Sequence, residues 1–175
     1  RLVGSEMCIR DSSCNGANDG TITSTVTGGN GGYNFNLQPE NIDNITGGYA
    51  NLGPGVKSVK VTDMKGCSNT KNITIGEPTK IVFSTGAKNA TCLESSNGKA
   101  WLGNVSGGAG PNYSYAWSTT PTQTTDTVYN LAGNKQYTVT ITDQNGCTVS
   151  KNQFVGVDYI LTIDNIIPTN TKCFG

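Results

Sequence analysis

The sequence lacks histidine altogether, which removes the commonest general base, the usual metal ligand and the usual partner of a serine or cysteine nucleophile. Charge is scarce too: 14% of the residues are charged and the formal net charge is zero. Because nucleic acid and anionic membrane need a basic face, neither is an expected partner. No apolar segment approaches the roughly twenty residues of a membrane helix, so we expect no membrane insertion. We therefore predict a protein that is not an enzyme, with no catalytic, cofactor-binding or metal-binding residues.

Glycine, threonine and asparagine are abundant instead. The chain of 175 residues holds 23 glycines, and short runs rich in β-branched residues alternate with clusters of Gly, Asn and Pro. No window has apolar residues at helical spacing. The sequence therefore predicts an all-β fold.

The first twelve residues, RLVGSEMCIRDS, differ from the rest in composition and in pattern. They resemble the translated adaptor sequence found in many assembled reading frames. We therefore interpret 1–12 as non-native and leave Cys8 out of the cysteine count; a genuine N-terminal tail is the alternative.

An internal repeat organises the remainder. The turn TDMKGC at 62–67 returns as TDQNGC at 142–147, eighty residues later (147 minus 67). About eighty residues is near the size of one small β-sandwich. We predict repeat 1 at 13–76, lacking its first strand, a complete repeat 2 at 77–157, and the start of a truncated repeat 3 at 158–175.

Two pairs of segments show the alternation of a half-buried strand. In YNFNL (33–37) and YSYAW (113–117) the aromatic residues and Leu37 share one face. We favour a sandwich core strand here over an aromatic platform that stacks a ligand. Later in repeat 2, Tyr137, Val139 and Ile141 are expected to point inward. Lys57 stands at the position of Tyr137 in repeat 1, which predicts a more exposed strand end.

The turns NGANDG (15–20) and DQNG (143–146) carry side-chain oxygens of the kind that bind Ca²⁺. The complete calcium loop with its closing glutamate is missing, so we favour turn capping.

The ordered set of motifs, Cys-Asn-Gly with a following Asp-Gly, a double glycine, Tyr-x-Tyr-x-Trp, a Thr/Val strand and Asp-x-x-Gly-Cys, resembles the SprB repeat of Bacteroidota cell-surface adhesins. The resemblance covers nearly all of 13–175. It implies tandem immunoglobulin-like or PKD-like β-sandwich repeats on large exported proteins, some of which move along the cell surface during gliding. Repeat 1 departs from this pattern at Leu37, because the equivalent position in repeat 2 is Trp117.

Four cysteines enter the disulfide prediction: Cys14, Cys67, Cys92 and Cys147. Four cysteines allow three connectivities. If the strands between two cysteines of a repeat run simply up and down, an even number of strands brings the cysteines together; a Greek-key crossover leaves them a strand length apart. We favour pairing within each repeat, where a bridge stabilises by about 4 kcal/mol in the chain-entropy model. Pairing of Cys14 with Cys147 across the repeat junction and free buried thiols are the alternatives.

The sequence thus predicts a structural and adhesive repeat array of a large secreted or cell-surface bacterial protein, at the outer membrane. The expected partners are neighbouring repeats and polysaccharide or a solid surface, bound weakly at many modules, with a role in gliding motility. The alternative is a spacer or carbohydrate-binding accessory module of a secreted enzyme.

Overall fold

A computed structural model describes residues 2–159, with side chains from Glu6 onward, and every helix or strand element in this part is a β-strand. The strands of the first repeat are β1 (Leu2–Arg10), β2 (Gly20–Gly28), β3 (Asn34–Gln38), β4 (Ile42–Asn44), β5 (Gly48–Leu52), β6 (Gly55–Thr62) and β7 (Ser68–Ile75). Those of the second are β8 (Thr79–Lys88), β9 (Ala90–Cys92), β10 (Gly98–Gly108), β11 (Ser114–Trp117), β12 (Thr127–Leu131), β13 (Lys135–Thr142), β14 (Thr148–Val155) and β15 (Val157–Tyr159).

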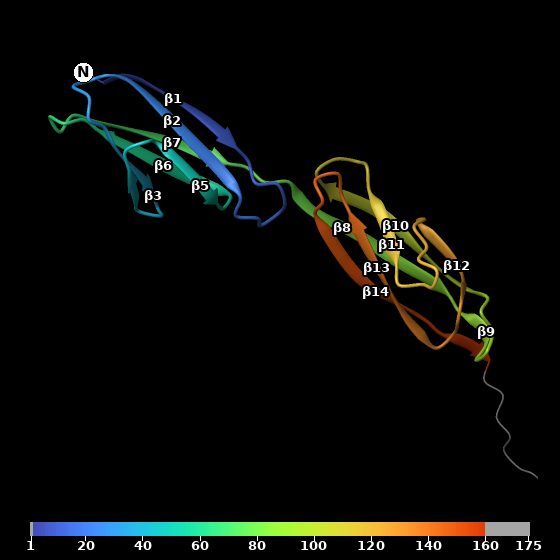
Figure 1. Cartoon of the computed structure of the whole chain (residues 1–175). Helices are drawn as coiled ribbons and strands as arrows, with labels where there is room; N and C mark the ends of the chain where they lie inside the picture. Colours follow the sequence, from blue (N-terminus) through green and yellow to red (C-terminus); the bar gives the residue numbers. More distant parts are fainter. Residues whose placement is uncertain (1, 160–175) are drawn as a thin grey trace, which may run out of the picture. The chain divides into compact units, whose positions relative to one another are not determined.

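Two antiparallel sheets make up the first repeat. One has the strand order β1-β2-β5 and the other β4-β3-β6-β7. Figure 1 shows the two sheets lying over one another, and the apolar residues of both meet in one core. Ile22 and Tyr49 enter the core from the first sheet, and Leu37, Val59 and Ile75 enter it from the second. The first repeat is therefore a β-sandwich.

The N-terminal residues take the place of a first strand in this sandwich. β1 runs antiparallel to β2, with Cys8 opposite Thr23 and Arg10 opposite Thr21. The expectation that repeat 1 (13–76) lacks a first strand of its own stays a prediction, because the strand that adds to the free edge of β2 consists of Leu2–Arg10. The origin of these residues, which we interpret as non-native, stays a prediction.

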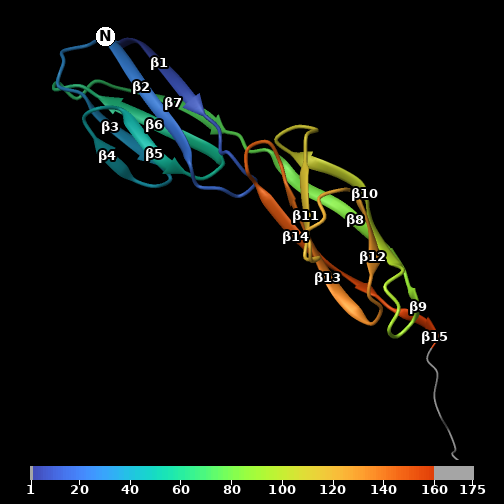
Figure 2. The same cartoon turned by 45° about the vertical axis from the view of Figure 1, so that its right-hand side comes forward.

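The second repeat has the same plan. Its sheets have the orders β12-β10-β8 and β11-β13-β14, and a short parallel pair joins β9 to β15 (Figure 2). β8, β10 and β12 occupy the positions of β1, β2 and β5, while β11, β13 and β14 occupy those of β3, β6 and β7. The repeat inferred from the sequence is thus a structural repeat; its boundaries at 76/77 and 157/158 remain predictions.

The alternation predicted for the core strands is confirmed. Leu37, Trp117, Val139 and Ile141 are all at most 1% exposed, and Tyr137 is 4% exposed. In β11 the Trp117 side chain lies in the core, as we favoured, while Tyr115 on the same face is half-buried.

The expectation that the strand end at Lys57 is exposed is wrong. Although Lys57 replaces Tyr137, it is buried, and its Nζ pairs with the carboxylate of Glu40. A lysine can do this because its aliphatic stem packs against apolar neighbours while the charged end reaches a partner. Burial, the largest single influence, opposes ionisation of Glu40, but the hydrogen bond and charge of Lys57 together with a backbone hydrogen bond outweigh it, so the pKa of Glu40 is lowered.

By its internal contacts the chain divides into two compact units. The first comprises the chain up to Val82 together with Val105–Tyr113 and Thr142–Val149. The second comprises Phe83–Asn104, Ser114–Ile141 and the described residues from Ser150 to Tyr159. Two loops of the second repeat, one after β10 and one between β13 and β14, thus belong to the first unit.

Candidate functional site: the Cys14–Cys147 disulfide and the repeated turns

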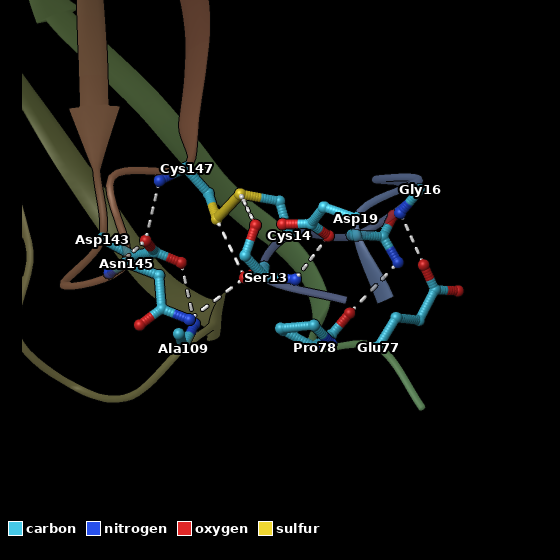
Figure 3. Close-up of a disulfide and its surroundings, with 11 residues drawn as sticks. Ser13, Cys14, Gly16, Asp19, Glu77, Pro78, Ala109, Asp143, Asn145 and Cys147 are labelled. Atoms are coloured by element: carbon cyan, nitrogen blue, oxygen red, sulfur yellow. Dashed lines mark hydrogen bonds between the residues drawn. A yellow bond between two sulfur atoms is a disulfide. The ribbon is translucent and has the colours of Figure 1, made fainter. Parts of the chain in front are cut away.

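The first unit contains a disulfide between Cys14 and Cys147, which are 133 positions apart in sequence and have Cα atoms 5.7 Å apart (Figure 3). It joins the segment before β2 in the first repeat to the turn between β13 and β14 in the second. Cys67 and Cys92 are exposed free thiols. The pairing that we favoured, Cys14 with Cys67 and Cys92 with Cys147, is therefore wrong in this structure, which has the junction pairing instead.

The strand connections explain this outcome. Cys14 lies before the start of β2. Cys67 follows the turn of Asp63, and the Asp63 carboxylate accepts hydrogen bonds from Asn30, which lies just beyond the end of β2. The two cysteines therefore lie at opposite ends of a nine-residue strand, roughly 30 Å apart at about 3.3 Å per residue. A disulfide tolerates only about 6 Å between Cα atoms. The chain crosses between sheets instead of running simply up and down, which was the condition for pairing within a repeat.

Hydrogen bonds hold the segment around Cys14. The backbone N–H of Ser13 donates to Oδ1 of Asp19 at 2.9 Å. Hydrogen bonding from the Ser13 side chain, and then from this N–H, lowers the pKa of Asp19. The Cys14 carbonyl accepts from the N–H of Ala17 at 3.0 Å. From the turn that carries Cys147, Nδ2 of Asn145 donates to the Ser13 carbonyl at 3.1 Å (Figure 3). The local turn thus presents the sulfur of Cys14 in a fixed position.

The chain leading into the second repeat passes the same place. Nδ2 of Asn15 donates to the carbonyl of Pro78 at 3.1 Å, and the N–H of Gly16 donates to Oε2 of Glu77 at 2.5 Å. The N–H of Ser12 donates to the carbonyl of Gly76 at 3.0 Å. The connection Gly76–Pro78 is therefore fixed beside the segment that carries Cys14.

Asp143 organises the turn that carries Cys147. Its Oδ1 accepts the N–H groups of Asn145 and Cys147, both at 2.9 Å, and its Oδ2 accepts the N–H of Ala109 at 2.8 Å. Burial opposes ionisation of Asp143, but these backbone N–H donors outweigh it, so the pKa of the carboxyl group is lowered. The carboxylate thereby ties the turn before β14 to the glycine loop after β10.

Asp63 does the same in the first repeat. Oδ1 accepts from the N–H groups of Lys65 and Cys67, both at 2.9 Å, and Oδ2 accepts from the N–H and the side-chain amide of Asn30 at 3.2 and 2.9 Å. The hydrogen bond from the Asn30 side chain is the main reason why the pKa of Asp63 is lowered. Turn capping is the observed role of both aspartates. Among residues whose placement is described, no three His, Cys, Asp or Glu side chains gather as a metal site would require.

Sequence reasoning found the turns but missed their long-range partners. Nothing local in GGNGG (28–32) or GGAG (107–110) shows that these loops bond to an aspartate more than thirty positions away. The available signal was the recurrence of a glycine loop and an Asp-x-x-Gly-Cys turn in the same order in both repeats.

The two tryptophans differ sharply in environment. Trp117 is 1% exposed, and its Nε1–H donates to the carbonyl of Thr125 at 3.1 Å. Trp101 is half-buried on β10, with the Lys99 ammonium 5.2 Å from the ring centroid. Its indole lies directly over Gly86 of β8, where any Cβ would approach the ring to 2.6 Å. Trp101 is therefore the tryptophan that a solvent-borne ligand can reach.

The strand order defines the class of protein. Immunoglobulin domains place their strands A, B and E in one sheet and C, F and G in the other. β1, β2 and β5 against β3, β6 and β7 reproduce this division, with β4 as an additional edge strand beside β3. The chain is thus a tandem of immunoglobulin-like β-sandwich repeats, as the sequence predicted.

Two segments, residues 9–40 and 84–122, match the family model of the SprB repeat. The chain carries SprB repeats, in confirmation of the resemblance drawn from its motifs, and such repeats occur in cell-surface proteins. The repeat family supports a structural or adhesive domain. Within the described residues, no helix is long and apolar enough to cross a membrane.

No curated protein sequence matches the chain. Among solved structures, the chain is similar to a C-terminal 282-residue fragment of intimin in complex with the intimin-binding domain of the translocated intimin receptor, at 14% identity and a TM-score of 0.41. The match covers 89% of this chain and 64% of the fragment, so the chain spans less than two thirds of it. It is also similar to the amphioxus IgVJ-C2 molecule, at 10% identity and a TM-score of 0.32, covering 90% of this chain and 98% of that one.

Proposed function

We propose that the chain is a segment of a long repeat array on a secreted, surface-exposed adhesin of a Bacteroidota cell, attached at the outer membrane. In this role each repeat adds length and carries load along its strands. The array makes weak contacts with polysaccharide or a solid surface at many modules, and in a gliding cell these contacts provide traction. The observation that supports this most directly is the duplicated sandwich, whose two copies are joined by Cys14–Cys147.

The disulfide suits a load-bearing, exported protein. Disulfides persist outside the cytoplasm and are rare within it. A covalent bridge between repeats adds a second connection beside the peptide chain, so that pulling on the array is shared between two paths. This supports a mechanical role, in which the repeats resist extension.

The outer faces favour weak and distributed binding. The outward face of β2 carries four threonines, each at least partly exposed, which alternate with buried or half-buried residues: Thr21, Thr23, Thr25 and Thr27. Such hydroxyl-rich faces of low charge remain hydrated and offer many single hydrogen bonds. Linking modules in one chain turns weak contacts into strong attachment, because later contacts form at high effective concentration.

Glycan binding can be tested directly on the chain. Polysaccharides are titrated while tryptophan emission is recorded, since Trp101 is accessible and Trp117 is buried. We expect a weak, saturable change that Trp101→Phe abolishes. A tandem of two chains should then attach to a polysaccharide-coated surface at least tenfold more tightly than one. Equal attachment by both, or no change with any glycan, would contradict the adhesive role.

The alternative is a spacer or carbohydrate-binding accessory module of a secreted enzyme. A long sequencing read through the native gene separates the two functions, and also tests the origin of residues 1–12. Many further repeats leading to an export domain would support the array. A catalytic domain beside two or three repeats would support the alternative.

A further inference from the structure

Cys92 has the same local structure as the bonded Cys14. The N–H of Thr91 donates to Oδ1 of Asn97 at 3.0 Å, as that of Ser13 does to Asp19 at 2.9 Å. The Cys92 carbonyl accepts from the N–H of Ser95 at 3.1 Å, which matches the bond from Ala17 to Cys14 at 3.0 Å. The turn that positions the sulfur of Cys14 for its partner is therefore already built around Cys92.

The departing chain also passes both cysteines in the same way. In the first repeat, Ser12 donates to the Gly76 carbonyl and the Gly76 N–H donates to Asp11 at 2.8 Å. In the second repeat, Ala90 donates to the Gly156 carbonyl and the Gly156 N–H donates to Asn89 at 3.0 Å. β15 then runs parallel to β9, with Tyr159 opposite Cys92. The chain thus leaves the second repeat directly beside Cys92.

Cys67, in turn, repeats the structure around the bonded Cys147. In each case the N–H of the cysteine donates to the carboxylate of the turn aspartate, Asp63 or Asp143, at 2.9 Å. The carbonyl of Cys67 accepts from Asp63 at 2.9 Å and that of Cys147 from Asp143 at 3.0 Å. Both free thiols are exposed, so a partner can reach them.

We propose that Cys92 and Cys67 are half-cystines of further junctions, so that the array is a continuous ladder of disulfides. In this ladder the first cysteine of every repeat bonds the turn cysteine of the repeat that follows. Cys92 bonds the equivalent of Cys147 in the next repeat, and Cys67 bonds the equivalent of Cys14 in the preceding one. The partner in both cases is another SprB repeat.

Each rung forms when two thiols lose two protons and two electrons to become a disulfide. The electron acceptor is a thiol oxidant that itself carries a disulfide, such as oxidised glutathione or a protein oxidant, and it is reduced to two thiols by exchange. One disulfide is made for each one reduced, so the step is balanced. The inference rests on the repeat structure and on Cys14–Cys147, and does not depend on what the array binds.

The test extends the full chain by one repeat. Cys173 aligns with Cys92 in the sequence (173 minus 92 is 81), so Gly175 aligns with residue 94. A copy of residues 95–157 added after Gly175 therefore completes a third repeat. In this copy, a Ser150→Thr exchange changes the mass of the tryptic peptide that contains the copy of Cys147, so that it can be distinguished from the original peptide. The protein is oxidised in a glutathione buffer, alkylated, and digested without reductant.

We expect two linked peptide pairs: Cys14 with the original Cys147, and Cys92 with the mass-labelled copy. Cys67 should be alkylated, because this protein has no repeat before the first. If Cys14–Cys147 forms in the same molecules while Cys92 is alkylated, the ladder is refuted. A bond between Cys92 and Cys67 within one chain would refute it equally.

A second measurement does not depend on folding of the added repeat. The chain itself carries Cys8→Ser and Cys173→Ser, which leaves Cys67 and Cys92 as its free thiols. At high protein concentration, mild oxidation should give disulfide-linked oligomers. In these oligomers, bonds between Cys92 of one copy and Cys67 of another should be at least fivefold more frequent than bonds between the Cys92 residues of two copies. Random pairing among the two thiols, or purely monomeric protein, would contradict the complementary roles of the two turns.

Discussion

Asp143 accepts the backbone N–H of Cys147 at 2.9 Å, so the carboxylate that closes the turn also holds the half-cystine that bonds Cys14. The same carboxylate accepts the N–H of Ala109 in the neighbouring glycine loop at 2.8 Å. One side chain therefore fixes two loops and one end of the disulfide. Asp63 repeats this arrangement around a cysteine that is free.

Asp143→Ala should destabilise the protein by about 2 kcal/mol, because it removes a buried carboxylate and leaves partly buried backbone donors without their charged acceptor. Urea unfolding of the oxidised variant and the parent protein measures the difference. Asp158→Ala, which removes an exposed carboxylate on β15, is the matched control and should change the free energy of unfolding by less than about 0.5 kcal/mol. Equal stability of the Asp143 variant and this control would show that the turn needs no carboxylate.

Stability should fall in acid. The pKa values of Asp63 and Asp143 are lowered in the folded state, so the unfolded chain takes up protons first as the pH falls. Their stabilising contribution is complete above the unfolded pKa of about 3.9 and is lost as the pH drops through the folded values. Urea midpoints measured from pH 6 to pH 2 should decline most steeply below about pH 4. The double variant Asp63→Asn, Asp143→Asn should show a shallower decline, and an unchanged slope would contradict this assignment.

Breaking the disulfide should cost up to about 5 kcal/mol in the chain-entropy model, because Cys14–Cys147 closes a loop spanning 133 positions. Cys14→Ser should therefore unfold at lower denaturant than the parent under oxidising conditions, and reductant should have no further effect on it. Cys92→Ser is the control, since its thiol is free. If both serine variants unfold together with the parent, the bridge contributes nothing to stability.

Trp117→Ala should destabilise the second repeat by about 3–5 kcal/mol, since the indole is 1% exposed and its removal leaves a cavity in the core. Tyr129→Ala on β12, where the ring is 55% exposed, is the matched aromatic control and should cost less than about 1 kcal/mol. Thermal unfolding followed by circular dichroism gives both values. A Trp117 variant as stable as the Tyr129 variant would remove Trp117 from the core.

Glycines with the same backbone angle should differ in tolerance. Gly107 (φ 86°) and Gly146 (φ 85°) both adopt a conformation that disfavours a side chain. A Cβ at Gly107 would also lie 2.1 Å from the Lys80 carbonyl oxygen, whereas nothing lies within 4 Å at Gly146. Gly107→Ala should therefore lower the melting temperature clearly more than Gly146→Ala, and equal losses would show that backbone strain alone decides.

The local pattern was sufficient for much of the fold. Alternation alone placed Leu37, Trp117 and Ile141 in the core, because successive side chains of a strand point to opposite faces and the apolar face packs inward. It failed at Lys57, where burial depends on Glu40, seventeen residues away. No periodicity contains that information.

The cysteine pairing shows the same limit more strongly. An up-and-down order of the strands would have allowed bridges within each repeat, yet the connectivity depends on where the chain crosses between sheets and on which end of β2 each cysteine occupies. Those are properties of the assembled sandwich. The recurrence of the motifs did indicate that the two cysteines of one repeat have equivalents in the next, and this equivalence underlies the disulfide ladder.

Peptide mapping of the purified, oxidised chain without reductant tests the junction disulfide most directly. We predict that the peptide containing Cys14 is linked to the peptide containing Cys147, while Cys67 and Cys92 are recovered as alkylated thiols. Recovery of Cys14 linked to Cys67, together with Cys92 linked to Cys147, would contradict it and make each repeat a separately bridged module.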